Sequence, residues 1–327
     1  MKPIDFSSII PKIQNIIDRH KLADGSYGRW PGDTQPNPYG CADAANILYS
    51  IGNFPSCPAE RAEWVKVLQG MQDPETGLFT EATHHTIHTT AHCMAAIELF
   101  DASPLHRAYA LEQYMDKEKM AAFFDTLRWI DSPWDNSHRG AGLYVALNLG
   151  GSDCVQFNRD YFAWLWENAD PETGFWRKGC QDGTRPIWHH MAGSFHYLFN
   201  HEHTHMPLRY PEKVIDSCLD MYKNRRNEHP SFGKTAGFME IDWIFCLTRA
   251  KAQTPHRWEE ATAALEAFAA EYAQFWMNAD FETDKNLNDL HMLFGAVCAL
   301  AELQRDLRGR ILTEKPLKLV LDRRPFI

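Results

Sequence analysis

The sequence predicts an all-α fold in which six helical hairpins form two concentric rings, an (α/α)6 toroid. One observation is a repeated order along the chain: an amphipathic helix, a turn rich in Asp, Gly and aromatic residues, and a second helix that is apolar on nearly all sides. Another is the turn itself, which occurs as QDPETGLF at residues 72–79 and as ADPETGFW at residues 169–176. The third is length, because six units of about 50 residues account for the whole chain of 327 residues.

The amphipathic first helix of each unit is expected on the outside of the ring. In residues 59–71, AERAEWVKVLQGM, the side chains of Trp64, Leu68 and Met71 fall on one stripe, which is typical of a helix with one buried face. We expect the outer helices to begin near Phe6, Pro58, Asp116, Phe157, Pro211 and His256.

The second helix of each unit is expected on the inside. Residues 88–100, HTTAHCMAAIELF, are small or apolar around most of the helix, and a helix that is apolar on all sides is buried. We expect the inner helices to begin near Tyr39, His85, Ser137, Trp188, Gly237 and Asp289. Each inner helix then packs against two inner neighbours and its own outer partner.

The repeated DPETG turn is first a structural device that joins an outer helix to an inner one. Its proline restricts the backbone, and Gly77 and Gly174 can adopt the positive φ that other residues rarely take. The aromatic residue that follows, Phe79 or Trp176, is expected to fill the space between the two rings.

The whole chain, residues 1–327, is expected to form this single toroid domain, with residues 309–327 as a C-terminal extension that packs on the ring. Strand-like alternation is scarce apart from LKLVL at residues 317–321. The hydrophobic content of 44% is sufficient for a large core. Eight cysteines are scattered without a CxxC pair, which indicates free and mostly buried thiols.

Charge and hydropathy disfavour two classes of partner. The formal net charge of -10 opposes nonspecific nucleic-acid binding. No apolar run approaches the roughly 18 residues that span a bilayer, and the first residues lack the apolar stretch of a signal peptide. We therefore expect a cytoplasmic protein whose partner is a small molecule or an oligosaccharide, and the oligomeric state is left open.

The segment LQGMQDPETGLF at residues 68–79, followed by an inner helix, resembles the repeat of the α/α-toroid enzymes. This group contains the six-hairpin glycosidases and the polysaccharide lyases built on the same ring, and also the terpenoid cyclases and protein prenyltransferases. The resemblance covers most of the chain and implies the fold. It does not select one family, because a fold does not fix a function.

In such a ring the loops from outer to inner helices all open at one end, so the first turns of the inner helices surround a shared central funnel. Titratable and polar side chains recur at this place in an otherwise apolar setting. They are Asp43, Asn46, His84, His85, His88, His138, Arg139, Tyr144, His189, His190, Glu240, Asp242, Asp289 and His291. Such a collection predicts an active site in the funnel.

The predicted catalytic residues are Glu240 or Asp242 working with Asp43 or His189. Apolar neighbours in GFMEIDWIF favour a raised pKa for Glu240, which suits a general acid. Glu240 and Asp242 cannot form the couple themselves, because residues i and i+2 point about 200° apart on a helix. Asp43 and Asp289 have an alternative role as helix-start residues that accept backbone N–H groups.

A second group of residues is predicted to contact the substrate. In HHTIHTTAH, His85, His88 and His92 fall at positions i, i+3 and i+7, one stripe of a helix. The spacing of His88 and His92 is compatible with a metal, but no HExxH or Cys-His pattern accompanies it, so we expect no metal and no cofactor. The predicted substrate contacts are His85, His88, Tyr144, His190, Trp188, Trp243, Arg139, Asp289, His291 and Trp176.

These residues favour a carbohydrate-active enzyme, a glycoside hydrolase or an oligosaccharide or polysaccharide lyase, that uses general acid–base chemistry in the funnel. The alternative is a terpenoid cyclase or prenyltransferase. Its acidic DxDD motif is absent, although Asp242, Cys246 and His291 resemble the zinc set of the prenyltransferases, with a different Asp–Cys spacing. A noncatalytic ligand-binding ring is the third hypothesis.

Overall fold

The computed structural model describes residues 2–224 and 230–326 of the chain. These residues are mostly helical, and the only strands among them are β1 (Ile4–Asp5) and β2 (Ile311–Leu312), which pair in parallel. The predicted all-α character is confirmed. All eight cysteines are free thiols, as predicted, and Cys57 alone is exposed. No described helix combines the length and the apolar composition needed to cross a bilayer.

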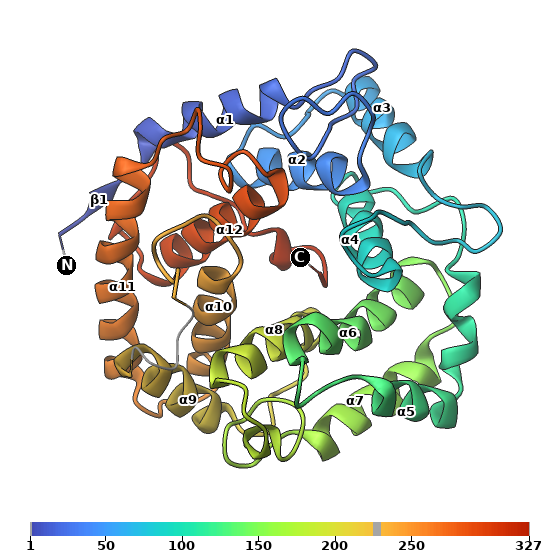
Figure 1. Ribbon diagram of the computed structural model, residues 1–327, viewed down its shortest axis with the longest axis vertical. Helices are drawn as coiled ribbons and strands as arrows, with labels where there is room; N and C mark the ends of the chain where they lie inside the picture. The colour runs from blue at the N-terminus through green and yellow to red at the C-terminus, as the bar shows by residue number, and fades with distance from the viewer. Residues whose placement is uncertain (1, 225–229, 327) are drawn as a thin grey trace.

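Two sets of α-helices alternate along the chain. The first set comprises α1 (Ile10–Arg19), α3 (Pro58–Gln69), α5 (Lys117–Thr126), α7 (Val155–Asn168), α9 (Pro211–Lys223) and α11 (Trp258–Asn278). The second set comprises α2 (Pro38–Ser50), α4 (Thr86–Glu98), α6 (Pro133–Leu149), α8 (Ile187–Thr204), α10 (Met239–Lys251) and α12 (Leu290–Asp306). In Figure 1 the second set surrounds the centre of the molecule and the first set lies outside it.

The inner helices pack on one another in a closed circle. α2 contacts α4, α4 contacts α6, and the contacts continue through α8 and α10 to α12, which packs against α2. The last helical pair therefore meets the first, as Figure 1 shows for α12 and α2. The N-terminal turns of α4, α6, α10 and α12 lie at the same end of this circle, where they line a common cavity.

Most predicted helix starts agree with the structure to within two residues. The inner helices α2, α4, α8 and α12 begin within one residue of the predicted positions. α6 begins at Pro133, four residues before the predicted Ser137, because the first turn of a helix accepts a proline whose missing N–H would have no partner there. The strand-like alternation at 317–321 does not form a strand, since β2 lies earlier and the short 3-10 helix η5 (Val320–Asp322) occupies part of that segment.

The repeated turn has the predicted geometry in both copies. Oδ1 of Asp73 accepts the backbone N–H groups two and three residues further along at 3.0 and 2.7 Å, and Gly77 has a φ of 74°. Oδ1 of Asp170 accepts the equivalent N–H groups at 3.0 and 2.8 Å, and Gly174 has a φ of 77°. The positive φ predicted for both glycines is confirmed.

The aromatic residues after the turns lie between the two sets of helices. Phe79 is completely buried, and its N–H donates to Oγ1 of Thr90 in α4 at 2.9 Å. The N–H of Trp176 donates to Oγ of Ser194 in α8 at 3.0 Å, and its indole N–H donates to the carbonyl of Leu165 in α7 at 2.8 Å. Trp176 therefore fills the space between α7 and α8 and is not placed for the substrate contact that the sequence predicted.

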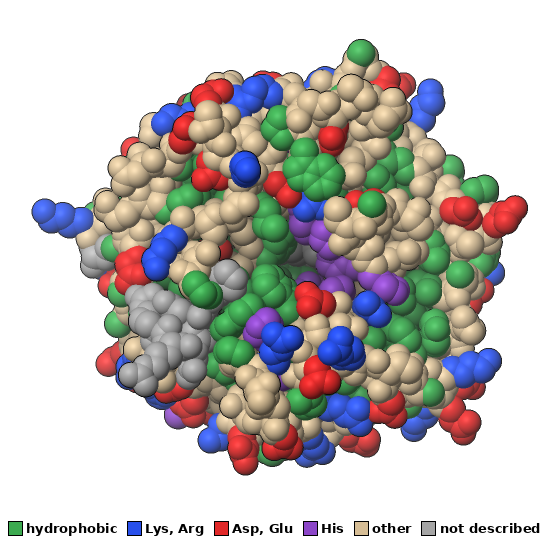
Figure 2. Space-filling model, viewed as in Figure 1, with side chains coloured by type: hydrophobic (Ala, Val, Ile, Leu, Met, Phe, Trp, Pro, Cys, Tyr) green, Lys and Arg blue, Asp and Glu red, His purple; other side chains and the backbone are tan. Residues whose placement is uncertain are grey.

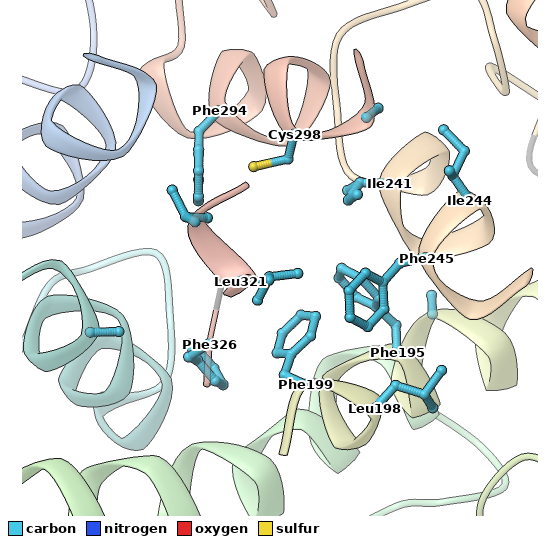
Figure 3. Close-up of a cluster of buried hydrophobic side chains, with 14 of the residues drawn as sticks. Phe195, Leu198, Phe199, Ile241, Ile244, Phe245, Phe294, Cys298, Leu321 and Phe326 are labelled. Atoms are coloured by element: carbon cyan, nitrogen blue, oxygen red, sulfur yellow. The ribbon is translucent and has the colours of Figure 1, made fainter. Parts of the chain in front are cut away.

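The C-terminal segment enters the centre of the circle of inner helices (Figure 1). The N–H of Lys318 donates to the carbonyl of Ser50 at the end of α2 at 2.9 Å, and η5 packs against α2 and α8. Leu321 and Phe326 join a buried apolar cluster with side chains of α8, α10 and α12 (Figure 3). Residues 319–321 are all buried, which explains why the alternating pattern did not produce a strand with one exposed face.

Replacing Gly77 by alanine is expected to destabilise the protein by more than about 2 kcal/mol. At a φ of 74° the new Cβ would lie 1.7 Å from the carbonyl oxygen of Arg107. Gly25→Ala is the control, because Gly25 has a φ of 85° but its Cβ would meet no atom within 4 Å, so that only a backbone penalty of about 1–2 kcal/mol remains. Urea unfolding measures both variants, and equal losses would contradict the close approach at Gly77.

Candidate functional site

A cavity of about 190 Å³ lies at the centre of the circle of inner helices. Figure 2 looks into the central hollow and shows histidine side chains gathered on its wall. Its lining residues come from α4, α6, α8, α10 and α12 and from the loops before them: His84, His88, Trp134, Asp135, His138, His196, Phe238, Asp242, His291 and Met292. The end of the circle at which the sequence places a funnel therefore contains a cavity.

Three histidines on one side of the cavity stack against a single buried tyrosine. The rings of His84, His88 and His92 have centroids 4.3, 6.0 and 4.8 Å from that of Tyr39 and are nearly parallel to it. The Tyr39 hydroxyl is hydrogen-bonded to Nδ1 of His88. His84 precedes α4, and His92 does not line the cavity, so the three rings that stack on Tyr39 are not the predicted helix stripe of His85, His88 and His92.

His85, predicted to hold the substrate, instead caps α4. The helix begins at Thr86, and Nδ1 of His85 accepts the N–H of Ile87 at 3.1 Å. The backbone of His85 is extended, with φ of -66° and ψ of 137°. The predicted stripe assumed that His85 belongs to the helix, whereas the residue precedes it and satisfies one of its free N–H groups.

A buried carboxylate connects three inner helices. Asp43 in α2 has no exposed surface, and its two oxygens accept hydrogen bonds from Nε2 of His92 in α4 at 2.7 Å and from Nδ1 of His291 in α12 at 3.1 Å. Burial alone raises the pKa of a carboxyl, but the two imidazoles outweigh burial and hold the pKa of Asp43 well below its usual value. Asp43 is therefore ionised, and the helix-start role in α2 belongs to Asn37.

Asp43 also determines which nitrogen of His291 carries the hydrogen. A carboxylate can only accept, so Nδ1 of His291 is the donor, which leaves Nε2 as the acceptor nitrogen whenever the ring is an imidazole. His291 lines the cavity, and the charge of Asp43 would stabilise an imidazolium formed there. His291 thus has the arrangement of a general base that is oriented by a third group.

Asp289 is a helix-start residue, which was the alternative to a substrate contact in the sequence analysis. Its side chain accepts the N–H of His291 at 3.0 Å as the N-cap of α12. Its two oxygens also accept hydrogen bonds from Nε and Nη2 of Arg29 at 2.8 and 2.9 Å, and one of them accepts a hydrogen bond from the indole N–H of Trp30 at 3.1 Å. These contacts occupy both carboxyl oxygens, so Asp289 has little capacity left for a substrate.

Asp242 and Glu240 lie on opposite sides of α10. Asp242 lines the cavity, and neither of its carboxyl oxygens has a hydrogen-bond partner among the described residues. Burial, and then the nearby Glu240, raise the pKa of Asp242 well above its usual value, which favours the protonated form of its carboxyl. Oε1 of Glu240 accepts the N–H of Gly233 at 2.7 Å, and burial raises the pKa of Glu240 to about 7. Of the two predicted acids, only Asp242 borders the cavity.

Two further imidazoles of the cavity wall are neutral. Nδ1 of His138 donates to the carbonyl of Trp134 at 2.6 Å, and Nδ1 of His196 donates to that of Ala192 at 3.2 Å, so that both Nε2 atoms are acceptors. Burial lowers the pKa of His138 to about 4 and that of His196 well below its ordinary value. These rings offer hydrogen-bond acceptors to a ligand without adding charge.

Three predicted substrate contacts are buried away from the cavity. Tyr144 stacks on Tyr161 of α7 with 4.9 Å between the ring centroids. The indole N–H of Trp243 donates to the carbonyl of Cys218 in α9 at 3.0 Å. His190 is completely buried, and burial lowers its pKa to about 4. All three were predicted in the funnel because they lie close in sequence to the start of an inner helix. An inner helix is buried on every side, however, and only one of its faces borders the cavity.

Trp188, His189 and Arg139 are near the cavity but do not line it. The ring of His189 stacks on that of Trp188 at 3.5 Å. Trp188 packs edge-on against the lining residue Trp134 at 5.6 Å, and Arg139 is half-buried beside His138 in α6. The catalytic role predicted for His189 is therefore not supported by its position, which suits contact with a part of a ligand outside the cavity.

Tyr39 and His196 were not among the residues predicted for the site. Tyr39 precedes Asp43 by one helical turn, and His196 follows His189 by two turns. Each therefore shares a helix face with a residue that was predicted. This periodicity within each inner helix is the signal that could have found them.

Asp43, His92 and His291 are also close enough to hold a metal, with donor atoms within 4.8 Å of one another. Two features oppose a cation at this place. Metal-bound histidines usually donate their second ring N–H to an acceptor, but Nδ1 of His92 has no partner in the described part of the chain. The fully buried guanidinium of Arg324 adds a positive charge to the same interior.

The purified protein is expected to contain no stoichiometric transition metal, because the oxygens of Asp43 are already satisfied by two imidazoles. Elemental analysis should find far less than one zinc, iron or manganese ion per chain, and EDTA should leave the melting temperature unchanged. One bound ion per chain, together with a lower melting temperature after chelation, would contradict this prediction.

Acidification is expected to destabilise the protein between pH 6.5 and about 4. Burial lowers the pKa of His138, His190 and His201 to about 4, against about 6.5 in an unfolded chain. Between these values the unfolded state binds more protons than the folded state, so the free energy of unfolding falls as the pH falls. The melting temperature should drop across this range, and drop less in His201→Gln, which removes one such group beside Phe162. A flat profile would exclude buried neutral histidines.

Comparisons of the chain with protein-family models, with curated proteins and with solved structures find no match. The chemistry of the cavity therefore has to follow from its own side chains. They combine a carboxyl with a raised pKa and no hydrogen-bond partner among the described residues, Asp242, with an imidazole, His291, that is held by a buried carboxylate.

Proposed function

We propose that this chain is an enzyme of the (α/α)6 toroid type that acts on a carbohydrate, as a glycoside hydrolase or a lyase, in the central cavity. The observation that carries the proposal is the presence of two different groups on one cavity. Asp242 is a buried carboxyl without a hydrogen-bond partner among the described residues, and His291 is an imidazole whose Nδ1 is held by the buried Asp43. Cleavage of a glycosidic bond needs such an acid and such a base together.

Asp242 is the general acid in this proposal. Its carboxyl has no hydrogen-bond partner among the described residues, so its proton is available to the oxygen of the departing sugar. His291 is the base, which takes a proton from the attacking water in hydrolysis or from a carbon next to a carboxylate in elimination. In both cases the buried charge of Asp43 stabilises the imidazolium that forms.

The carboxyl groups on the cavity wall favour hydrolysis by an activated water, or elimination, over a mechanism with a covalent glycosyl-enzyme intermediate. A retaining glycosidase uses a second carboxylate as nucleophile, about 5 Å from the acid. Apart from Asp242, the only carboxyl lining the cavity in the described part of the chain is that of Asp135, which accepts the hydroxyl of Ser132 at 2.7 Å. A water-activating base therefore predicts inversion if the enzyme is a hydrolase.

The wall of the cavity supports a sugar better than an isoprenoid chain. Polar ring nitrogens alternate with flat apolar faces, supplied by His84, His88, His138, His196, Trp134 and Phe238. Sugar hydroxyl groups need several hydrogen-bond partners, whereas an apolar chain needs few. The zinc set expected for a prenyltransferase, Asp242, Cys246 and His291, is not gathered into a metal-binding group within the described residues.

Asp242→Asn is expected to lower the turnover of a saccharide substrate roughly 10²–10⁴-fold, the usual loss for a general acid. Glu240→Gln is the matched control, because it makes the same chemical change in the same helix on the side away from the cavity. It should alter turnover less than about tenfold. Both variants are compared with the wild type for rate and melting temperature. Unchanged turnover in a folded Asp242→Asn variant would rule out Asp242 as the acid.

The products distinguish the two chemistries within this proposal. A hydrolase releases saturated sugars with new reducing ends from neutral disaccharides. A lyase acts on a uronate-containing disaccharide and forms a double bond conjugated to the carboxylate, which absorbs in the ultraviolet. Saturable binding of these sugars without any product would instead support a noncatalytic ligand-binding ring.

A further inference from the structure

The C-terminal segment runs through the inside of the circle of inner helices. It enters at the end opposite the cavity, where Lys318 is bonded to the last residue of α2, Ser50. η5 then packs against both α2 and α8, which lie on different sides of the circle. Further on, Nδ2 of Asn200 in α8 donates to the carbonyl of Pro325 at 3.2 Å. The segment therefore crosses the interior from one side to the other.

Phe326 brings this segment to the cavity wall. Its ring is completely buried and meets the rings of His88 and His196 at centroid distances of 5.0 and 5.9 Å. Both histidines line the cavity. On its other side the ring of Phe326 packs edge-on against Phe199, within the apolar cluster of Figure 3. Phe326 thus lies between two histidines of the cavity wall and the apolar cluster.

We propose that residues 318–326 form the floor of the cavity and that Phe326 limits the site to the terminal unit of a saccharide chain. This inference rests on the proposed function and specifies its substrate class. A floor leaves the cavity open at one end only, so a chain can enter by its end but cannot pass through. Cleavage then removes one unit at a time from the end of the chain.

The size of the cavity supports the same substrate class. Its volume of about 190 Å³ is smaller than the roughly 300–1,000 Å³ typical of sites for drug-sized ligands. It therefore admits one ring-sized group. Trp134, which lines the cavity, and Trp188, which packs edge-on against it, are placed to contact the next unit outside.

The test compares two forms of the disaccharide that the protein cleaves best: the free form, and one whose terminal ring carries a 4,6-benzylidene cap. The wild type should strongly prefer the free form. Phe326→Ala removes the floor, so the ratio of kcat/KM for the capped form to that for the free form should rise at least about tenfold. Phe245→Ala is the matched control, because it removes the same side chain from the same cluster, where it packs on Phe195 and Phe199, and it should keep the wild-type ratio.

Three outcomes would overturn the inference. One is an unchanged ratio in a folded Phe326→Ala variant, and another is release of fragments of random length from a long chain by the wild type. Either result leaves the proposed function intact. Absence of activity on every saccharide would instead remove the proposed function together with this inference. If Phe326→Ala does not fold, Phe326→Leu with a smaller 4-O-methyl cap provides the same comparison.

Discussion

The hydrogen bonds from His92 and His291 to Asp43 are the interaction on which the rest of the structure depends. They join α2, α4 and α12, at the place where the last helical pair meets the first. An ionised carboxylate with no exposed surface is costly unless hydrogen-bonded partners compensate for the lost water. Closure of the circle supplies those partners. The same contact fixes the tautomer of His291. The hydrogen bond that helps to close the circle of helices therefore also orients this imidazole.

Neutral imidazoles make the interior of this protein possible. Protonated rings packed this closely would repel one another, and burial keeps the pKa of His88, His138 and His196 low enough to prevent it. Arg324 is buried with Asp43 in the same region, so opposite charges share the interior. The result is a polar cavity with little net charge, which suits an uncharged or weakly charged ligand.

Local sequence patterns predicted the helices and the turns between them. They did not predict the direction in which single side chains of the inner helices point. The DPETG turn is recognisable in the sequence because glycine adopts the positive φ of Gly77 and Gly174 far more readily than other residues do. The sequences of the inner helices do not show which face borders the cavity, since a helix that is apolar on all sides has no polar face to distinguish it. For this reason Tyr144 and Trp243 were assigned to the funnel with Asp242. His85 was misplaced by a helix start that differs by one residue. The path of residues 318–326 depends on contacts with distant helices that no local pattern encodes.

The pairing of β1 with β2 has a consequence for how the protein folds. Ile4 lies opposite Ile311, so this short parallel ladder joins segments from the two extremes of the chain. The bond between Asp43 and His291 spans 248 positions, and the contact between His88 and Phe326 also joins distant segments. Loops of this length close slowly, because chain entropy opposes contacts between distant positions. The cavity can therefore form only after α12 has packed against α2, so segments far apart in the sequence must meet before the side chains of the site come together.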